Sequence, residues 1–329
     1  MNRRNFVHLA AGLLVATFAA HAQTRKKARI GVLIQTTPEG TRHLMAAFID
    51  RLAELGWTDG KNVEFLVRYA ERDPGRHALL VAEVLAQKPD VIYAPFGLFA
   101  LAAKKQTAEL PIVFSIVDDP VAMGLVVTLA RPGGNATGVT TRGRELSGKR
   151  LQILREVVPT LRRIGVTGHV TTPEHRATLE EVGRVAGKLG VEVVEVVKAQ
   201  WALSDSAAFG PAIAELVRHR VDAILGLTYM IFPLHREFVQ HVAHAKLPAM
   251  YDAEEFVQAG GLMSLSVSFA DRYREAANYV DRILRGAKPA DLPVQEPTRF
   301  VFAINLKTAK ALGLKIPQSL LVRADRVIE

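Results

Sequence analysis

The second half of the sequence repeats the first, and this repeat constrains the fold more than any other feature. Residues 29–32 read RIGV, and the same four letters recur about 134 residues further on. Four shorter matches follow in the same order with nearly constant spacing: Leu55-Gly56 with Leu189-Gly190, Asp90-Val91-Ile92 with Asp222-Ala223-Ile224, Leu110-Pro111 with Leu247-Pro248, and Gly133-Gly134 with Gly260-Gly261. Two repeats of this length predict two similar lobes, whereas a solenoid would need more and shorter repeats.

Within each lobe, short apolar runs alternate with segments of helical periodicity. In the first half we expect strands at 29–34, 62–68, 91–94, 112–117 and 136–140, and helices at 40–56, 74–87 and 97–107. Such alternation is typical of a parallel sheet with helices on both faces. The predicted fold class is therefore α/β, with two similar doubly wound parallel-sheet lobes joined by a hinge.

One long amphipathic segment is left over after the second lobe. Residues 268–286 read as a helix, and the simplest arrangement packs it back on the first lobe. We therefore expect lobe 1 at 28–140 plus 267–298 and lobe 2 at 141–266, with hinge crossings near 139–144 and 265–269. The tail, 299–329, carries a strand and a short helix that the sequence does not place.

The first 22 residues have the layout of an export signal. Arg3 and Arg4 precede an apolar run at 6–20, and Ala20-His21-Ala22 fits a small-residue cleavage site. The apolar run is too short to favour a membrane anchor, and a chain with no cysteine has no lipid attachment site or disulfide. We expect a periplasmic protein cleaved near Ala22, exported by either the twin-arginine or the general route.

The stretch from 110 to 139 places an acidic turn where ligands bind in such folds. Its first strand is followed by Asp118, Asp119 and Pro120. Asp119 is expected to cap a helix with Pro120 at its first position. The turn would then lie at the carboxyl end of a parallel strand, which is the ligand-binding edge of open α/β sheets.

The stretch that contains this turn resembles a known family. The pattern PIVF…DDP…GLV…LARPGGNATG within 110–139 is similar to the ABC-transporter substrate-binding family related to the tryptophan-binding protein, and so are KPDVI at 88–92, NLKTA at 305–309 and ALGLKIP at 311–317. The resemblance implies a type I periplasmic-binding fold that closes over a small ligand. The sequence departs from the family pattern at Pro95-Phe96-Gly97 and at Asp118, both in the expected cleft, so the ligand is not carried over.

The expected ligand site consists of side chains that follow strands in both lobes. Hydroxyl groups and helix N-terminal amides suit a carboxylate, a carboxylate suits an amine, and aromatic rings suit an apolar portion. For Asp118, turn formation competes with an amine-binding role, and for Thr36 and Thr37 helix capping competes with anion binding. The candidate residues are Gln35, Thr36, Thr37, Phe96, Gly97, Asp118, Thr171, Tyr229, Tyr251 and Asp252.

Other classes of function find no support in the sequence. The net charge of +9 is scattered, with no basic block interleaved with aromatic residues, so we expect no nucleic-acid binding. His235, His241 and His244 lack an accompanying glutamate at zinc-enzyme spacing, so we expect no metal site. The phosphate-loop, dinucleotide and nucleophile-elbow motifs are also missing, so we expect no cofactor and no catalysis.

The sequence thus predicts an extracytoplasmic solute-binding protein of an ABC importer. It would bind a small amine- or carboxylate-bearing ligand, amino-acid-like or aromatic, and present the closed form to a membrane permease, as a monomer. A ligand-sensing module that docks on a membrane receptor is one alternative. A two-lobed transferase is the other, but it would need a catalytic pair or a phosphate loop.

Overall fold

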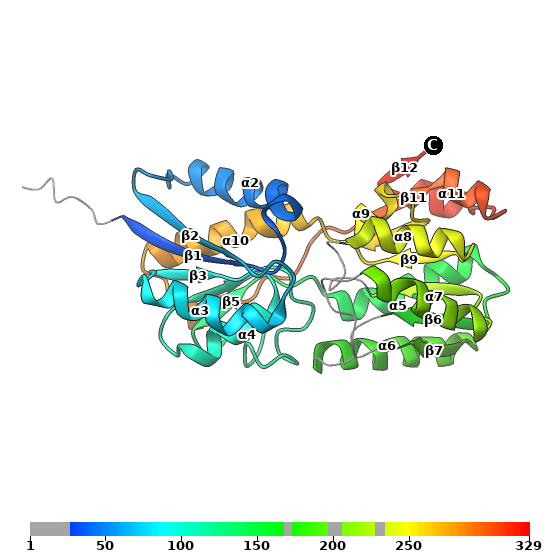
Figure 1. The fold of residues 1–329 in the computed structure, drawn as a ribbon, viewed down its shortest axis with the longest axis horizontal. Coiled ribbons are helices and arrows are strands. Elements are labelled where there is room, and N and C mark those ends of the chain that lie inside the picture. Colours follow the sequence, from blue (N-terminus) through cyan, green and yellow to red (C-terminus); the bar gives the residue numbers. More distant parts are fainter. Residues whose placement is uncertain (1–26, 168–172, 197–205, 228–233) are drawn as a thin grey trace, which may run out of the picture.

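The computed structural model describes residues 27–167, 173–196, 206–227 and 234–329, so Thr171, Tyr229 and the expected export signal at 1–22 lie outside the described residues. The described chain forms two lobes side by side, each built on one sheet (Figure 1). The first sheet is entirely parallel, in the order β2-β1-β3-β4-β5. Its strands are β1 (Ala28–Ile34), β2 (Val63–Tyr69), β3 (Val91–Tyr93), β4 (Ile112–Phe114) and β5 (Ala136–Gly138).

The second sheet repeats this order and then adds the tail of the chain. Strands β7-β6-β8-β9-β10 are parallel and correspond one by one to β2-β1-β3-β4-β5. Strand β11 then pairs antiparallel with β10, and β12 pairs parallel with β11, so the tail belongs to the second sheet. The strands are β6 (Arg163–Thr167), β7 (Glu192–Val196), β8 (Ala223–Gly226), β9 (Ala249–Tyr251), β10 (Met263–Ser266), β11 (Val301–Asn305) and β12 (Arg326–Ile328).

Helices cover the faces of both sheets, as the alternating pattern predicts. In the first lobe these are α2 (Pro38–Glu54), α3 (His77–Ala86), α4 (Gly97–Gln106) and α10 (Phe269–Leu284). The second lobe carries α5 (Gly143–Val157), α6 (Pro173–Leu189), α7 (Phe209–Arg218), α8 (His235–His244), α9 (Glu254–Gln258), α11 (Leu306–Ala311) and α12 (Gln318–Arg323). No helix in the described part of the chain is long and apolar enough to cross a bilayer.

The chain passes between the lobes at three places that lie close together. The first follows β5, the second joins β10 to α10, and the third leads from residues 292–300 into β11. Thr140 N donates to Gln295 O (2.9 Å) and Gln295 N donates to Gly138 O (3.0 Å), so the first and third crossings are hydrogen-bonded to each other. One apolar cluster also runs across the junction and includes Phe48 of lobe 1, Phe238 of lobe 2 and Phe269.

Two expectations for the stretch after β4 are wrong. The strand ends at Phe114 and does not extend to Val117. No α-helix follows Pro120: the chain makes a series of turns, in which Asp119 Oδ1 accepts from Ala122 N (2.9 Å) and Gly124 takes a positive φ of 72°. Asp119 therefore caps a turn, because the chain reverses at Gly124 before a helix can propagate. The segment at 74–87 also begins as a 3₁₀ turn, Pro74–Arg76, and becomes α-helical only at His77.

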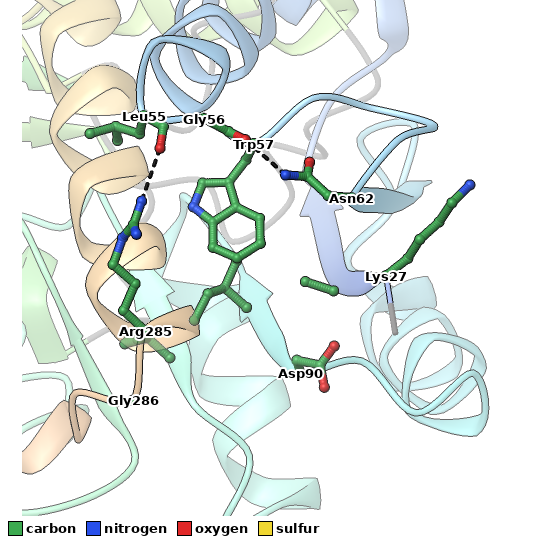
Figure 2. Close-up of a pocket in the computed structure, with 11 residues that line it drawn as sticks. Lys27, Leu55, Gly56, Trp57, Asn62, Asp90, Arg285 and Gly286 are labelled. Atoms are coloured by element: carbon green, nitrogen blue, oxygen red, sulfur yellow. Dashed lines mark hydrogen bonds between the residues drawn. The ribbon is translucent and has the colours of Figure 1, made fainter. Parts of the chain in front are cut away.

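Helix α10, which follows the second lobe in sequence, packs along α2 in the first lobe (Figure 1). At the far end of this pair, Trp57 Nε1 donates to Asp281 Oδ1 (2.8 Å), and Arg285 Nη2 donates to Leu55 O (2.9 Å). Figure 2 shows Trp57 between Arg285 and Asn62, whose amide donates to Gly56 O (2.8 Å). These bonds fasten the end of α10 to the turn after α2.

Replacing Trp57 tests whether its hydrogen bond to Asp281 stabilises the packing of α10 on α2. Trp57→Phe keeps an aromatic ring but removes the N–H donor, leaving Arg285 as the remaining partner of the buried Asp281 carboxylate. We expect the free energy of unfolding, measured by urea titration, to fall by about 1–2 kcal/mol. As a control, Glu83→Ala removes an exposed ion pair with Arg68 and should change it by less than about 0.5 kcal/mol. Equal stability of Trp57→Phe and the wild type would contradict the role of this hydrogen bond.

Candidate functional site

The carboxyl ends of strands from the two lobes meet beside the first crossing. The side chains that enclose this point come from both lobes and from the crossings themselves: Ile116, Asp118, Thr141, Gly143, Leu146, Arg150, Asp252, Val267 and Phe269. Asp118 follows β4 of lobe 1, whereas Asp252 follows β9 and Arg150 lies on α5, both in lobe 2. Two of the predicted site residues are therefore brought together, with an arginine that the sequence analysis missed.

Asp118 is held at the start of α5. The hydroxyl of Thr141 donates to its Oδ1, and Thr140 Oγ1 donates to the carbonyl oxygens of Val117 (2.8 Å) and Asp118 (2.9 Å). Gly143, the first residue of α5, has no side chain to displace the carboxylate: a Cβ there would overlap it. The carboxylate thus lies at a helix N-terminus, which favours negative charge.

The environment of Asp118 nevertheless raises its pKa. Burial is the main cause, and the Asp252 and Glu145 carboxylates act in the same direction. The Thr141 hydrogen bond and the Arg150 charge act in the opposite direction. Loss of hydration therefore outweighs the local donors, which is typical of a carboxyl group in a functional site.

Arg150 supplies the positive charge between the two carboxylates. Its side chain is only 3% exposed; Nε donates to Leu265 O (2.7 Å) and Nη1 donates to Ser147 Oγ (3.2 Å). Burial lowers the pKa of Arg150, and the Asp252 and Asp118 charges oppose that shift. Arg150 thus connects α5 to β10 and lines the same small space as carboxyl groups from both lobes.

The space left among these side chains is small. It measures about 20 Å³, which is enough for one water molecule. An amino-acid-sized ligand cannot lie between Asp118, Arg150 and Asp252 in this arrangement. In this structure the group is a contact between lobes, and ligand entry requires the lobes to move apart.

The other predicted residues of lobe 1 lie at the ends of β1 and β3. Thr37 caps α2 by accepting from Gly40 N (3.4 Å), and Thr36 and Gln35 are buried beside it. Phe96 precedes α4 and is 7% exposed within the apolar core, and Gly97 begins that helix. A Cβ at Gly97 would overlap Met123, so this glycine is explained by packing.

In lobe 2 the structure separates two neighbours that were predicted together. Tyr251 is 1% exposed and stacks on Phe256 with ring centroids 5.0 Å apart, whereas Asp252 lines the space beside Asp118. The rings of Tyr251 and Phe96 are both packed inside the core, so ligand contact by either stays a prediction.

Several buried polar atoms have no hydrogen-bond partner in the described structure, and many of them lie at strand ends. Gln35 follows β1, Thr167 ends β6 and Ser266 ends β10, and others lie on the segments that flank these ends, on Arg72, His77, Arg272 and Tyr273. Buried polar groups in folded proteins are nearly always paired with protein, water or ligand. Water or a bound molecule can supply the partners that these atoms lack.

A groove also lies on the α2 side of the second crossing. It measures about 440 Å³ and is lined by His43 and Leu44 of α2, by His235, Glu254 and Glu255 of lobe 2, and by Val267 to Ala270. Burial raises the pKa of Glu255 to about 7, helped by the Glu254 and Asp252 charges and opposed by Arg326. One carboxyl group beside the junction thus changes charge near neutral pH.

Comparisons with known proteins agree on one family. The family described as ABC transporter substrate binding protein matches residues 29–328. A tyrosine-binding protein of Clostridioides difficile (strain R20291) is 27% identical over 293 residues, which cover 89% of this chain and 83% of that protein.

Two solved structures share the whole two-lobed fold. A conserved domain protein from Vibrio cholerae O1 biovar eltor strain N16961 has a TM-score of 0.84 and is 26% identical, covering 92% of this chain and 100% of that one. The ABC domain in complex with L-Trp from Streptococcus pneumonia has a TM-score of 0.83 and is 26% identical, with the same coverage. The matched family is one of binding proteins, and the Streptococcus structure holds L-Trp, which agrees with the lack of any catalytic motif in the sequence.

A double-mutant cycle tests the position of the Asp118 carboxylate against Thr141 and Gly143. Gly143→Ala forces the carboxylate away from Thr141, so we expect the free energy of unfolding to fall by about 1–3 kcal/mol. In an Asp118→Ala background the same change should cost much less, because no carboxylate remains to collide with. Gly134→Ala, where a Cβ meets nothing within 4 Å, is the control. A cost of Gly143→Ala that is the same in both backgrounds would contradict the proposed contact.

Glu255→Gln tests the charge beside the junction. The pKa of Glu255 is about 7, above its usual 4.5, so the unfolded chain releases this proton first as pH rises. Stability is therefore lost between about pH 4.5 and pH 7, and the loss is complete above pH 7. Glutamine cannot ionise, so Glu255→Gln does not undergo this loss. Its free energy of unfolding should exceed that of the wild type by roughly 2–3 kcal/mol at pH 8 and by almost nothing at pH 4. If urea titrations show a stability difference between variant and wild type that does not vary with pH, the raised pKa of Glu255 is refuted. Glu83→Gln, at an exposed position, serves as the control.

Proposed function

This chain belongs to the ABC transporter substrate-binding protein family, and on that premise we propose that it binds an amino-acid-like ligand between its two lobes. The ligand carries an amine, a carboxylate or both, and an aromatic or branched apolar portion. Binding shifts the lobes from an open to a closed arrangement about the three crossings, and the ligand is released unchanged.

The similarity to relatives that bind aromatic amino acids supports this ligand class. One relative is named for tyrosine and another was solved with L-Trp, at 27% and 26% identity. Both matches extend over most of this chain, so the similarity includes the strand ends of both lobes. Identity at this level leaves room for a different side-chain specificity, which is why the ligand is proposed by class.

The meeting of acidic side chains from both lobes is the observation that carries the proposal. Asp118 of lobe 1 and Asp252 of lobe 2 enclose the same small space together with Arg150. An ammonium group of a ligand that enters between the open lobes suits these two carboxyl groups. When the lobes part, Asp118 leaves with lobe 1, and an ammonium group that binds it can then bridge to Asp252 as the lobes close.

We propose that the remaining predicted residues contact other parts of the ligand. Gln35, Thr36 and Thr37, with the amides at the start of α2 and α4 near Gly97, suit the carboxylate of the ligand. Phe96, Tyr229 and Tyr251 suit its apolar portion, and Thr171 its polar groups. No metal or cofactor is needed for this mode of binding.

Import is the proposed purpose of the binding. We propose that residues 1–22 direct export, that the mature chain acts as a monomer in the periplasm, and that its closed form docks on the permease of an ABC importer. Family membership supports the transport role. The lobes present different surfaces when open and closed, so a permease can distinguish the loaded protein from the empty one.

Titration calorimetry with L-tyrosine and L-tryptophan tests the proposal. The chain from Gln23 should bind at least one of them, and Asp118→Asn should weaken that binding about ten- to hundredfold because it removes the charge that faces the ammonium group. Asp59→Asn, in an exposed turn far from the junction, should bind as the wild type does. Binding untouched by Asp118→Asn would contradict the charge argument, and no binding of any amino acid would contradict the ligand class.

A further inference from the structure

The loop after β2 places Arg72 beside the end of β1, where it forms no ion pair with any of the residues that the structure describes. Arg72 N donates to Gln35 O (2.9 Å), and Glu71 N donates to Thr36 O (3.3 Å). The loop is therefore fastened to the residues that lead into α2, at the end of lobe 1 that faces lobe 2 (Figure 1).

Both residues joined by the backbone bond between Arg72 and Gln35 have side-chain groups without a hydrogen-bond partner in the described structure. Gln35 is 7% exposed, and its Nε2 and Oε1 are buried with no partner in the described structure. The Nε of Arg72 is likewise buried and has no partner there. A buried guanidinium N–H and a buried amide that lack partners are costly, and each is a donor that suits a carboxylate.

The carboxylates nearest in sequence are engaged elsewhere. Glu71 accepts from Arg76 (2.7 Å), and Asp73 accepts from Gly75 N (2.8 Å) as the cap of a 3₁₀ turn. His77, in the turn that follows, is buried, and its pKa is lowered to about 4, mainly by loss of hydration. The ring is therefore neutral at pH 7. Among the described residues, Arg72 forms no ion pair, and its buried Nε has no hydrogen-bond partner.

The backbone of the loop is held in an unfavourable conformation. Glu71 and Arg72 have φ values of 53° and 68°, the left-handed region that favours glycine. Two consecutive non-glycine residues in this region cost free energy, which the backbone hydrogen bonds to Gln35 and Thr36 help to offset. Glycine at position 72 would fit the backbone better but would lack the guanidinium.

We propose that Arg72 and Gln35 form an anion subsite of the ligand cleft in lobe 1, which takes the carboxylate of the bound molecule. The identity of its ligand rests on the proposed function. The subsite lies on the lobe-1 side of the cleft, apart from Asp118 and Asp252, which take the amine. A ligand with both charges is thereby fixed in direction: its carboxylate lies toward the β1 and β2 ends and its ammonium group toward the β4 and β9 ends.

Arg72→Gly separates this role from stability. The variant should be at least as stable as the wild type in urea titration, because it relieves the positive φ. Its affinity for L-tyrosine and for 3-(4-hydroxyphenyl)propionate should fall at least tenfold, while its affinity for tyramine, which has no carboxylate, should be unchanged. Lys61→Gly, which removes an exposed positive charge from the turn before β2, is the control and should bind all three as the wild type does. Unchanged carboxylate binding by Arg72→Gly overturns the subsite and leaves the proposed function standing.

A second measurement keeps the subsite testable should no amino acid bind. In protein labelled with ¹⁵N-arginine, the Nε–H signal of Arg72 is identified by its loss in Arg72→Gly. Titration with sodium benzoate against sodium chloride at equal ionic strength should move this signal saturably. A signal that moves without any amino-acid binding supports the subsite and refutes the proposed ligand class. A signal that benzoate does not move overturns the subsite.

Discussion

The contact between the loop after β4 and the start of α5 is the constraint on which the lobe arrangement depends. Asp118 belongs to lobe 1, but its carboxylate is held by Thr141 in the crossing and lies over Gly143, where lobe 2 begins. Arg150, two turns further along α5, is anchored to β10 through Leu265 O. The position of Asp118 thus depends on lobe 1, and the positions of Arg150 and Asp252 depend on lobe 2. A relative movement of the lobes therefore changes the distances from Asp118 to Arg150 and Asp252.

The sequence predicts the topology well because the repeat and the strand–helix alternation are properties of the whole chain. The order of the first five strands of lobe 2 copies that of lobe 1, as the matched segments imply. The prediction of a helix after Pro120 is wrong because a capping residue and a proline indicate only where a helix can begin. The chain reverses at Gly124, so no helix forms beyond the first turns. Local signals of this kind are overridden by the path that the next strand requires.

The site itself was predicted only in part. Asp118 and Asp252 could be placed because they follow strands, but Phe96 and Tyr251 have buried rings, since an aromatic residue after a strand serves the core equally well. Arg150 was missed, although it lies on the apolar stripe of α5 with Leu146, Ile153 and Val157. A charged residue within an otherwise buried stripe is the signal that would have found it, and Arg272 on α10 shows the same pattern. Arg72 was hidden because a positive φ in a non-glycine residue leaves no mark in the sequence.

Closure of the two lobes on a ligand is the central claim, and a distance measurement across the junction tests it most directly. The chain has no cysteine, so nitroxide labels can be placed specifically at Leu79→Cys on α3 and Val217→Cys on α7, both exposed positions in different lobes. Double electron–electron resonance of the labelled chain, without and with saturating L-tyrosine or L-tryptophan, reports the separation of the lobes. The account predicts a change from a broad distribution of distances to a single narrow one on binding. A distribution that is unchanged while calorimetry shows the ligand bound would contradict it.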